Sequence, residues 1–72
     1  MSLWNAQIGT TSIIRSVKTE DPELDAFLFT LGCYVGAPIT LISRRRGGCT
    51  VSIQDGRYHM DNHLAQAIIL EQ

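Results

Sequence analysis

Apolar and polar positions alternate along several stretches of the chain, which is the pattern of a β-strand with one buried face. Cys49, Val51 and Ile53 alternate with polar residues, so these three side chains share one face, which we expect to point into the core. Residues 39–43 alternate in the same way and predict a second strand. Residues 10–17 are rich in β-branched side chains and predict a third, with a bulge where the alternation is imperfect.

Two further strands are predicted toward the C-terminus. The dipeptide Asp55-Gly56 is typical of a two-residue hairpin turn and leads into a strand over residues 57–60. A short helical turn is expected over residues 61–65, because an aspartate and an asparagine at its start can cap it. The aliphatic run 68–70 then forms a last strand that pairs with earlier ones.

One helix is indicated between the first two strands. Asp21 supplies an N-cap acceptor, and Pro22 stands at the first helical position, where its missing N–H costs nothing. Gly32 ends the helix at the position that favours a left-handed residue. The apolar residues between these ends form one stripe: Leu24, Phe27, Leu28 and Leu31. A helix this short depends on laying that stripe against a sheet.

The order of these elements predicts a mainly β fold. We expect a small barrel of about five strands in a meander, with one short α-helix and a short helical turn before the last strand. Closure of the sheet would remove the strand edges that otherwise favour aggregation. The sequence has no internal repeat and no linker-like stretch, so residues 1–72 are expected to form a single domain.

The length and charge of the chain exclude several classes of function. No apolar run approaches the about 20 residues that cross a bilayer, and a secretory signal is missing, so we expect neither membrane insertion nor export. A net charge of -1 gives no overall positive field for nucleic acid. Trp4 is interpreted as the anchor of the N-terminal end, and residues 1–3 as in part an addition to the natural sequence.

The basic residues of the chain gather in one place. Arg44, Arg45 and Arg46 precede two glycines between two predicted strands, which favours a solvated hairpin tip. Contact with a phosphate or an acidic partner is the alternative interpretation. Nucleic-acid binding through these arginines and Tyr58 is a third, which the net charge disfavours.

The two cysteines do not indicate a disulfide scaffold or a zinc knuckle. Cys33 and Cys49 are too few for a stapled fold and are not closely paired, so we expect both to be reduced. Cys49 faces the predicted core, where burial raises the pKa of a thiol and makes it inert. Thiol catalysis is therefore not expected.

Short motifs follow one another in a recognisable order from about Ile8 to Leu70. In the first half they are Gly9, Ser12, Ile14, Val17, the Leu31-Gly32 helix end, Gly36 and Ile39-Thr40-Leu41. In the second half they are Val51-Ser52-Ile53, Asp55-Gly56, Tyr58-His59-Met60, Ala65, Ile68 and Leu70. In this order they resemble FeoA-type domains over nearly the whole chain.

The resemblance implies an SH3-like barrel and a non-catalytic role. It implies a small cytoplasmic accessory protein of bacterial ferrous-iron uptake, whose partner is the large membrane permease of the FeoB type, which carries a G-protein domain. The same domain is fused to iron- and manganese-responsive repressors in other proteins. Family members commonly carry an arginine before the Leu-Gly helix end and basic residues near the last turn. Residues 25–30 and Asp61 are less basic here, so the partner surface is expected to differ.

A weak metal site is one candidate for chemistry. His59 and His63 are four residues apart with Asp61 between them, and these residue types bind Fe²⁺ or Zn²⁺. His59 belongs to a predicted strand, so helical spacing does not bring the two imidazoles together, and both are interpreted first as surface residues. Two ligands alone hold an ion weakly. We therefore expect no tightly bound cofactor, and favour a site between the copies of a homodimer over one within a single chain.

A partner-binding surface is the other candidate. Phe29 lies off the helical stripe and Tyr34 follows the helix end, so the two rings are expected beside one another and partly exposed. The alternative is that Phe29 completes the small core. Together with Arg44, Arg45 and Arg46 these aromatic residues are the candidate partner-binding set. No catalytic constellation is present, because the carboxylates cluster at the helix start, where capping and the helix dipole explain them.

Three functions are thus left open. The first is a protein-interaction module that binds and modulates the permease. The second is a domain that binds a transition metal directly and senses it, as in the repressor-fused relatives. Nucleic-acid binding by a small barrel is the third and the least favoured.

Overall fold

The computed structural model describes residues 1–71 and shows the mainly β fold that the sequence predicts. Its strands are β1 (Thr11–Val17), β2 (Pro38–Arg45), β3 (Gly48–Ile53), β4 (Gly56–Asp61) and β5 (Ile68–Leu70). Its helical segments are the 3-10 helix η1 (Leu3–Asn5) and the α-helices α1 (Pro22–Leu31) and α2 (Asn62–Ala67). Within the described residues, no helix has the length and apolarity that a membrane crossing needs.

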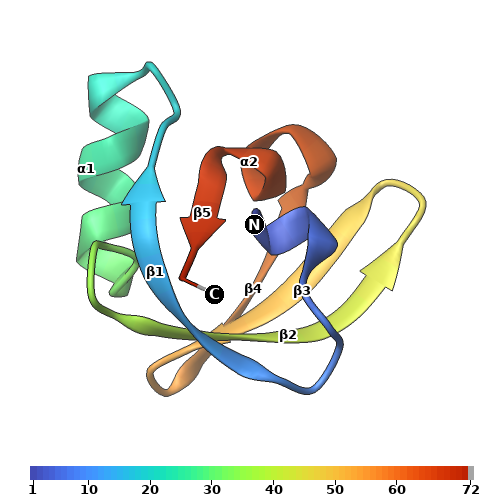
Figure 1. Cartoon of the computed structure of the whole chain (residues 1–72). Coiled ribbons are helices and arrows are strands. Elements are labelled where there is room, and N and C mark those ends of the chain that lie inside the picture. The colour runs from blue at the N-terminus through green and yellow to red at the C-terminus, as the bar shows by residue number, and fades with distance from the viewer. Residues whose placement is uncertain (72) are drawn as a thin grey trace.

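The five strands form one antiparallel sheet in the order β4-β3-β2-β1-β5. The first four strands make the predicted meander, and β5 returns to the free side of β1 (Figure 1). The sheet curls, and η1 and α2 lie on its inner side (Figure 1). The expected closure is wrong in one respect, because β4 and β5 are the two ends of the hydrogen-bonded order. Helix α2 connects β4 to β5 and contacts both strands.

A bulge lies in β1, as the imperfect alternation predicts. The pairing of β1 with β5 steps from Ile14 opposite Leu70 to Ser16 opposite Ile69, which makes Arg15 the extra residue. A second register shift lies in the pairing of β2 with β3. Bulges bend a strand and increase its twist, so these two irregularities help a sheet of short strands to curl.

The turn between β3 and β4 differs by one residue from the prediction. Ile53 pairs with Gly56, so the two turn residues are Gln54 and Asp55, and Gln54 takes the left-handed conformation with φ of 54°. Gly56 is the first residue of β4 and does not need a positive φ. The Tyr58 ring lies over it, in the space that a Cβ would occupy. Glycine is therefore favoured here by close packing of an aromatic ring and not by turn geometry.

The ends of α1 are those that the sequence predicts. One carboxylate oxygen of Asp21 accepts hydrogen bonds from two backbone N–H groups of the first turn, at 3.0 and 3.4 Å. Gly32 has φ of 99°, and its N–H donates to the Phe29 carbonyl at 3.0 Å. Both ends are set by local chemistry, which is why they could be predicted from sequence.

The apolar stripe of α1 is less buried than predicted. Leu28 is the only buried residue of the helix, while Leu24 and Leu31 are half-buried at the margin of the core. Phe27 is 58% exposed, so its assignment to the face that packs on the sheet is wrong. The helix therefore contacts the core mainly through Leu28, and the other residues of its stripe line a groove beside β4.

The core lies between the curled sheet, η1 and α2. Alternate residues of β3 point into it, as predicted, and Cys49 is among them. The buried residues are Leu3, Ala6, Ile14, Leu28, Cys33, Ala37, Ile39, Leu41, Cys49, Val51, Ile53, Met60, Ala65, Ile68 and Leu70.

The N-terminal residues belong to the fold. Leu3 is 1% exposed and contributes to the core. Ser2 forms a β-bridge with Ile69, and the Leu70 N–H donates to the Met1 carbonyl at 2.6 Å. The N-terminal segment and β5 therefore lie close together (Figure 1).

Helix α2 replaces the expected short turn and runs to Ala67, two residues further than predicted. Asp61 is its N-cap, and its carboxylate accepts from the Leu64 N–H at 2.8 Å. Ala65 is fully buried, and the small side chain lets the helix lie close to η1 and β3.

Candidate interaction surfaces

An aromatic pair stands on the surface next to the C-terminal end of α1. The rings of Phe29 and Tyr34 lie 4.9 Å apart between centroids at an interplanar angle of 38°. Phe29 is 63% exposed and Tyr34 is 37% exposed. The expected adjacency is confirmed, and the alternative in which Phe29 completes the core is wrong. A tilted pair at this distance is favourable in itself, so the two rings hold each other in place.

The loop after α1 fixes the position of this pair. The Cys33 N–H donates to the Leu28 carbonyl at 2.9 Å and turns the chain back along the helix. Two backbone hydrogen bonds then join the loop to β1. The Gly36 N–H donates to the Ile14 carbonyl at 2.8 Å, and the Ile14 N–H donates to the Ala37 carbonyl at 2.9 Å. Val35, between these anchors, is 66% exposed. We name Phe29, Tyr34 and Val35 the aromatic patch.

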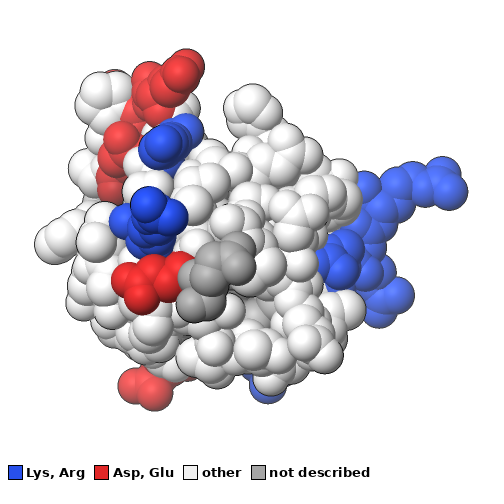
Figure 2. All heavy atoms as spheres, in the orientation of Figure 1, with Lys and Arg blue, Asp and Glu red and all other residues white. Residues whose placement is uncertain are grey.

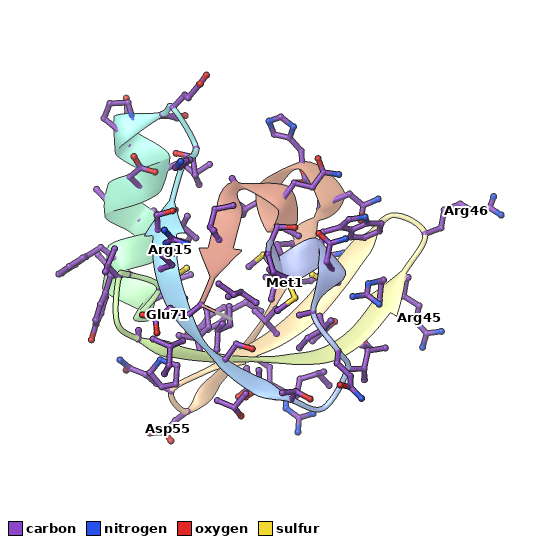
Figure 3. All side chains as sticks on the ribbon, in the orientation of Figure 1. Met1, Arg15, Arg45, Arg46, Asp55 and Glu71 are labelled. Carbon is purple, nitrogen blue, oxygen red and sulfur yellow. The ribbon has the colours of Figure 1, made fainter. Side chains whose placement is uncertain are left out.

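The three arginines separate into two kinds. Arg45 and Arg46 are exposed and extend into solvent from the end of the β2–β3 hairpin (Figure 3). The assignment of Arg44 to the same solvated tip is wrong, because its guanidinium group donates to the Ala6 carbonyl and lies 5.5 Å from the centre of the Trp4 ring. Arg44 therefore anchors the N-terminal segment to β2, and Trp4 has the anchoring role that was expected of it.

Charge is distributed unevenly over the molecule. Figure 2 shows basic side chains gathered at the end of the β2–β3 hairpin and acidic side chains gathered around the start of α1. The acidic residues are Glu20, Asp21, Glu23 and Asp25. Although the chain has a net charge of -1, its hairpin end is a local positive surface.

A groove of about 330 Å³ lies between α1 and β4. We name it the α1–β4 groove. Its lining is mostly apolar and comprises Leu24, Phe27, Leu28, Leu31, Arg57, Tyr58, His59, Met60 and Leu64. The sequence does not indicate this groove, because the helical stripe is expected to be covered and the position of β4 at the end of the sheet order is visible only in the structure.

The predicted metal ligands are not gathered into a cluster. His59 is exposed on β4 and His63 is exposed on α2, so the two histidines lie on different elements and helical spacing does not apply. The Asp61 carboxylate is engaged in capping α2. Within residues 1–71 there is no group of three or more histidine, cysteine, aspartate or glutamate side chains arranged to hold a metal ion. Metal binding by these residues stays a prediction.

Both cysteines are free and buried. Burial raises the pKa of the Cys33 thiol to about 11. Burial also raises the pKa of the Cys49 thiol, and the nearby charge of Arg44 opposes part of that rise. Both thiols are therefore protonated near neutral pH, which makes them poor nucleophiles and poor metal ligands.

The comparison with family models identifies the family. The model of the FeoA domain matches residues 1–72. This chain belongs to the FeoA family. Members of the family are non-catalytic accessory proteins associated with ferrous-iron transport, which agrees with the interpretation of this chain as a protein without enzymatic activity. Among proteins of curated function, none matches this chain.

Solved structures show the same fold. The FeoA protein of Stenotrophomonas maltophilia, solved with zinc and described as a prokaryotic SH3 domain protein, is 16% identical with a TM-score of 0.84, over 99% of this chain and 89% of that one. The FeoA protein of Chlorobium tepidum is 21% identical with a TM-score of 0.87, over 97% and 68%. The predicted SH3-like barrel is confirmed by these matches.

A manganese-dependent transcriptional repressor contains a similar domain. It is 23% identical with a TM-score of 0.82, over 94% of this chain. The match spans 39% of the length of the repressor. At this identity the likeness is one of fold, and it shows that the FeoA-type barrel also occurs as part of a larger protein.

Proposed function

We propose that this protein binds the cytoplasmic part of a ferrous-iron permease and modulates transport. The family association with ferrous-iron transport supports the pathway, and the resemblance described above supports the permease as partner and the cytoplasm as location. The aromatic patch is the observation that favours a docking role. It exposes two rings and one valine on a protein with a small core, where every apolar side chain would otherwise stabilise the fold by burial.

The arrangement of the patch suits binding. The loop that carries Tyr34 and Val35 is bonded to β1, so little conformational entropy is lost when a partner covers it. Aromatic residues in such rigid settings commonly contribute most of the affinity of an interface. Arg45 and Arg46 at the hairpin end would attract an acidic partner over a longer range and increase the rate of association.

A titration of the permease's purified cytoplasmic portion into the full chain tests this proposal. Phe29→Ala should weaken binding by at least tenfold, because it removes a central aromatic contact. Ile8 is 52% exposed and lies outside the patch, so Ile8→Ala is the matched control and should leave the affinity unchanged. Absence of binding by the natural protein, or equal affinities for the Phe29→Ala variant and the natural protein, would overturn the proposal.

A further inference from the structure

The two outer strands of the sheet differ in whether their free edge is covered. On the outer side of β5, Ser2 bridges to Ile69 and the Met1 carbonyl accepts from Leu70, so the N-terminal segment covers that edge. β4 is the other end of the sheet order, and within the described residues no strand pairs with its outer side. Exposed strand edges are templates for another strand and are usually blocked. β4 is the edge that this fold leaves available.

The backbone of β4 presents its free groups at two residues. Ile53 and Gly56 flank the two-residue turn and form a hydrogen-bonded pair, and bonded and non-bonded pairs alternate along an antiparallel ladder. Tyr58 and Met60 therefore direct their N–H and C=O groups to β3. Arg57 and His59 direct theirs to the outer side, which gives a partner strand four backbone groups to bind.

The α1–β4 groove runs along this same edge. Four consecutive residues of β4, from Arg57 to Met60, line it. Consecutive strand residues point to opposite faces, so all four can line one groove only if the edge of the strand is its wall. The opposite wall is the apolar stripe of α1, in which Leu28 is buried and Phe27 is the most exposed member.

We propose that the α1–β4 groove binds one extended segment of a partner protein, which adds to the sheet as a strand beside β4. The backbone groups of Arg57 and His59 would bond the segment. Its apolar side chains at alternate positions would continue the face of Tyr58 and Met60 and pack against the stripe of α1. This docking mode goes beyond the proposed function, because it specifies the conformation and chemistry of a ligand at a second surface.

The charge of the groove specifies the remaining positions of the segment. Arg57 is exposed and lines the groove, and no carboxylate is among the described residues that line it. The side chains on the outer face of the added strand would lie opposite Arg57 and His59. An acidic residue there forms a favourable cross-strand pair with Arg57, whereas a lysine would be repelled. The matching segment therefore alternates apolar and acidic residues.

This groove is separate from the aromatic patch. Phe27, in the groove, and Phe29, in the patch, are two residues apart and so point about 200° apart around α1. One helix thus separates the two surfaces, and variants at these two phenylalanines can test them independently.

The test uses a synthetic seven-residue peptide of alternating valine and glutamate, titrated into the isotope-labelled full chain and followed by NMR. We expect saturable shifts centred on β4 and α1, and at least tenfold slower amide exchange at Arg57 and His59. The same peptide with N-methyl groups on the amides that would bond β4 should not bind. It keeps every side chain but has lost the N–H donors that the carbonyl groups of Arg57 and His59 would accept from. Binding of the methylated peptide with equal affinity would overturn the proposal.

Charge reversal provides the second arm. Arg57→Glu should weaken binding of the glutamate peptide by at least fivefold and strengthen binding of a valine-lysine peptide. Arg15 is exposed and does not line the groove, so Arg15→Glu is the matched control and should change neither affinity. The readout lies at the groove and not at the aromatic patch, so failure here is distinguishable from failure of the proposed function. Shifts centred on the aromatic patch would overturn the proposal, and so would self-association through β4 in sedimentation, because the occupant would then be a second copy.

Discussion

The guanidinium group of Arg44 lies 5.5 Å from the centre of the Trp4 ring and donates a hydrogen bond to the Ala6 carbonyl. A residue of β2 thereby holds the N-terminal segment, which in turn supplies Leu3 to the core and covers the edge of β5. One arginine of a three-arginine run is a structural residue, and its two neighbours are not.

Arg44→Ala should therefore lower the free energy of unfolding by about 1–3 kcal/mol, from the lost cation–π contact and the lost charged hydrogen bond. Arg45→Ala is the matched control and should change it by less than about 0.5 kcal/mol, because its side chain is exposed. Urea unfolding followed by far-UV circular dichroism measures both. Equal effects of the two substitutions would contradict the assignment of Arg44 as an anchor.

Leu28 and Phe29 are neighbours on α1 with opposite environments. Leu28 is buried, so Leu28→Ala should cost about 2–5 kcal/mol through lost burial and a cavity. Phe29→Ala should cost less than about 1 kcal/mol, because it removes an exposed ring and its contact with Tyr34. Thermal unfolding of the two variants checks the order, and a larger loss from Phe29→Ala would argue that the aromatic patch is part of the core.

The elements that could be predicted from sequence are those set by local chemistry. Asp21 and Gly32 define both ends of α1 through hydrogen bonds to residues within one turn. Alternation in β3 correctly placed Cys49, Val51 and Ile53 in the core, because a strand with one buried face leaves no other choice.

What could not be predicted depends on contacts between distant segments. Arg44 and Arg45 are adjacent in the same run, and only the contacts of Arg44 with Trp4 and with the Ala6 carbonyl, far away in the sequence, distinguish them. The turn lies at Gln54 and Asp55, one residue before the Asp55-Gly56 motif, and Gly56 lies in β4 under the ring of Tyr58. The α1–β4 groove exists because β4 is the last strand at its end of the sheet, and no local sequence pattern specifies that position.

Gly47 and Gly48 are adjacent, and only the second is required. A Cβ on Gly48 would overlap the Met60 carbonyl oxygen, which is backbone of β4 and cannot move without breaking the sheet, whereas a Cβ on Gly47 meets nothing within 4 Å. Gly48→Ala should therefore destabilise the protein by about 1–3 kcal/mol or more, and Gly47→Ala should be nearly neutral. Chemical denaturation of the two variants tests this, and a neutral Gly48→Ala would show that β4 can shift away.

The buried thiol of Cys33 should make the protein less stable at alkaline pH. Burial raises its pKa to about 11 in the folded protein from an ordinary value of 9.0, so between these values the folded state binds more protons than the unfolded state. Stability from this group is complete below pH 9 and is lost as pH rises toward 11, by roughly 2–3 kcal/mol in total. Unfolding free energies measured at pH 8, 9, 10 and 11 should fall less steeply in Cys33→Ala, and parallel slopes would contradict this origin.

Asp61 allows capping and metal binding to be separated. Its carboxylate accepts from the Leu64 N–H at 2.8 Å as the N-cap of α2. Asp61→Ala should therefore lower the free energy of unfolding by about 1 kcal/mol, whereas Asp61→Asn keeps a capping oxygen and should lower it much less.

We expect no submicromolar Fe²⁺ binding by the monomer in calorimetry, because the described residues hold no three-ligand cluster and two histidines alone bind an ion weakly. Submicromolar binding that is lost in His59→Ala would favour direct metal sensing instead. NMR shifts centred on His59, Asp61 and His63 during a Zn²⁺ titration would locate that site, and their loss in Asp61→Asn would show that the carboxylate is a ligand.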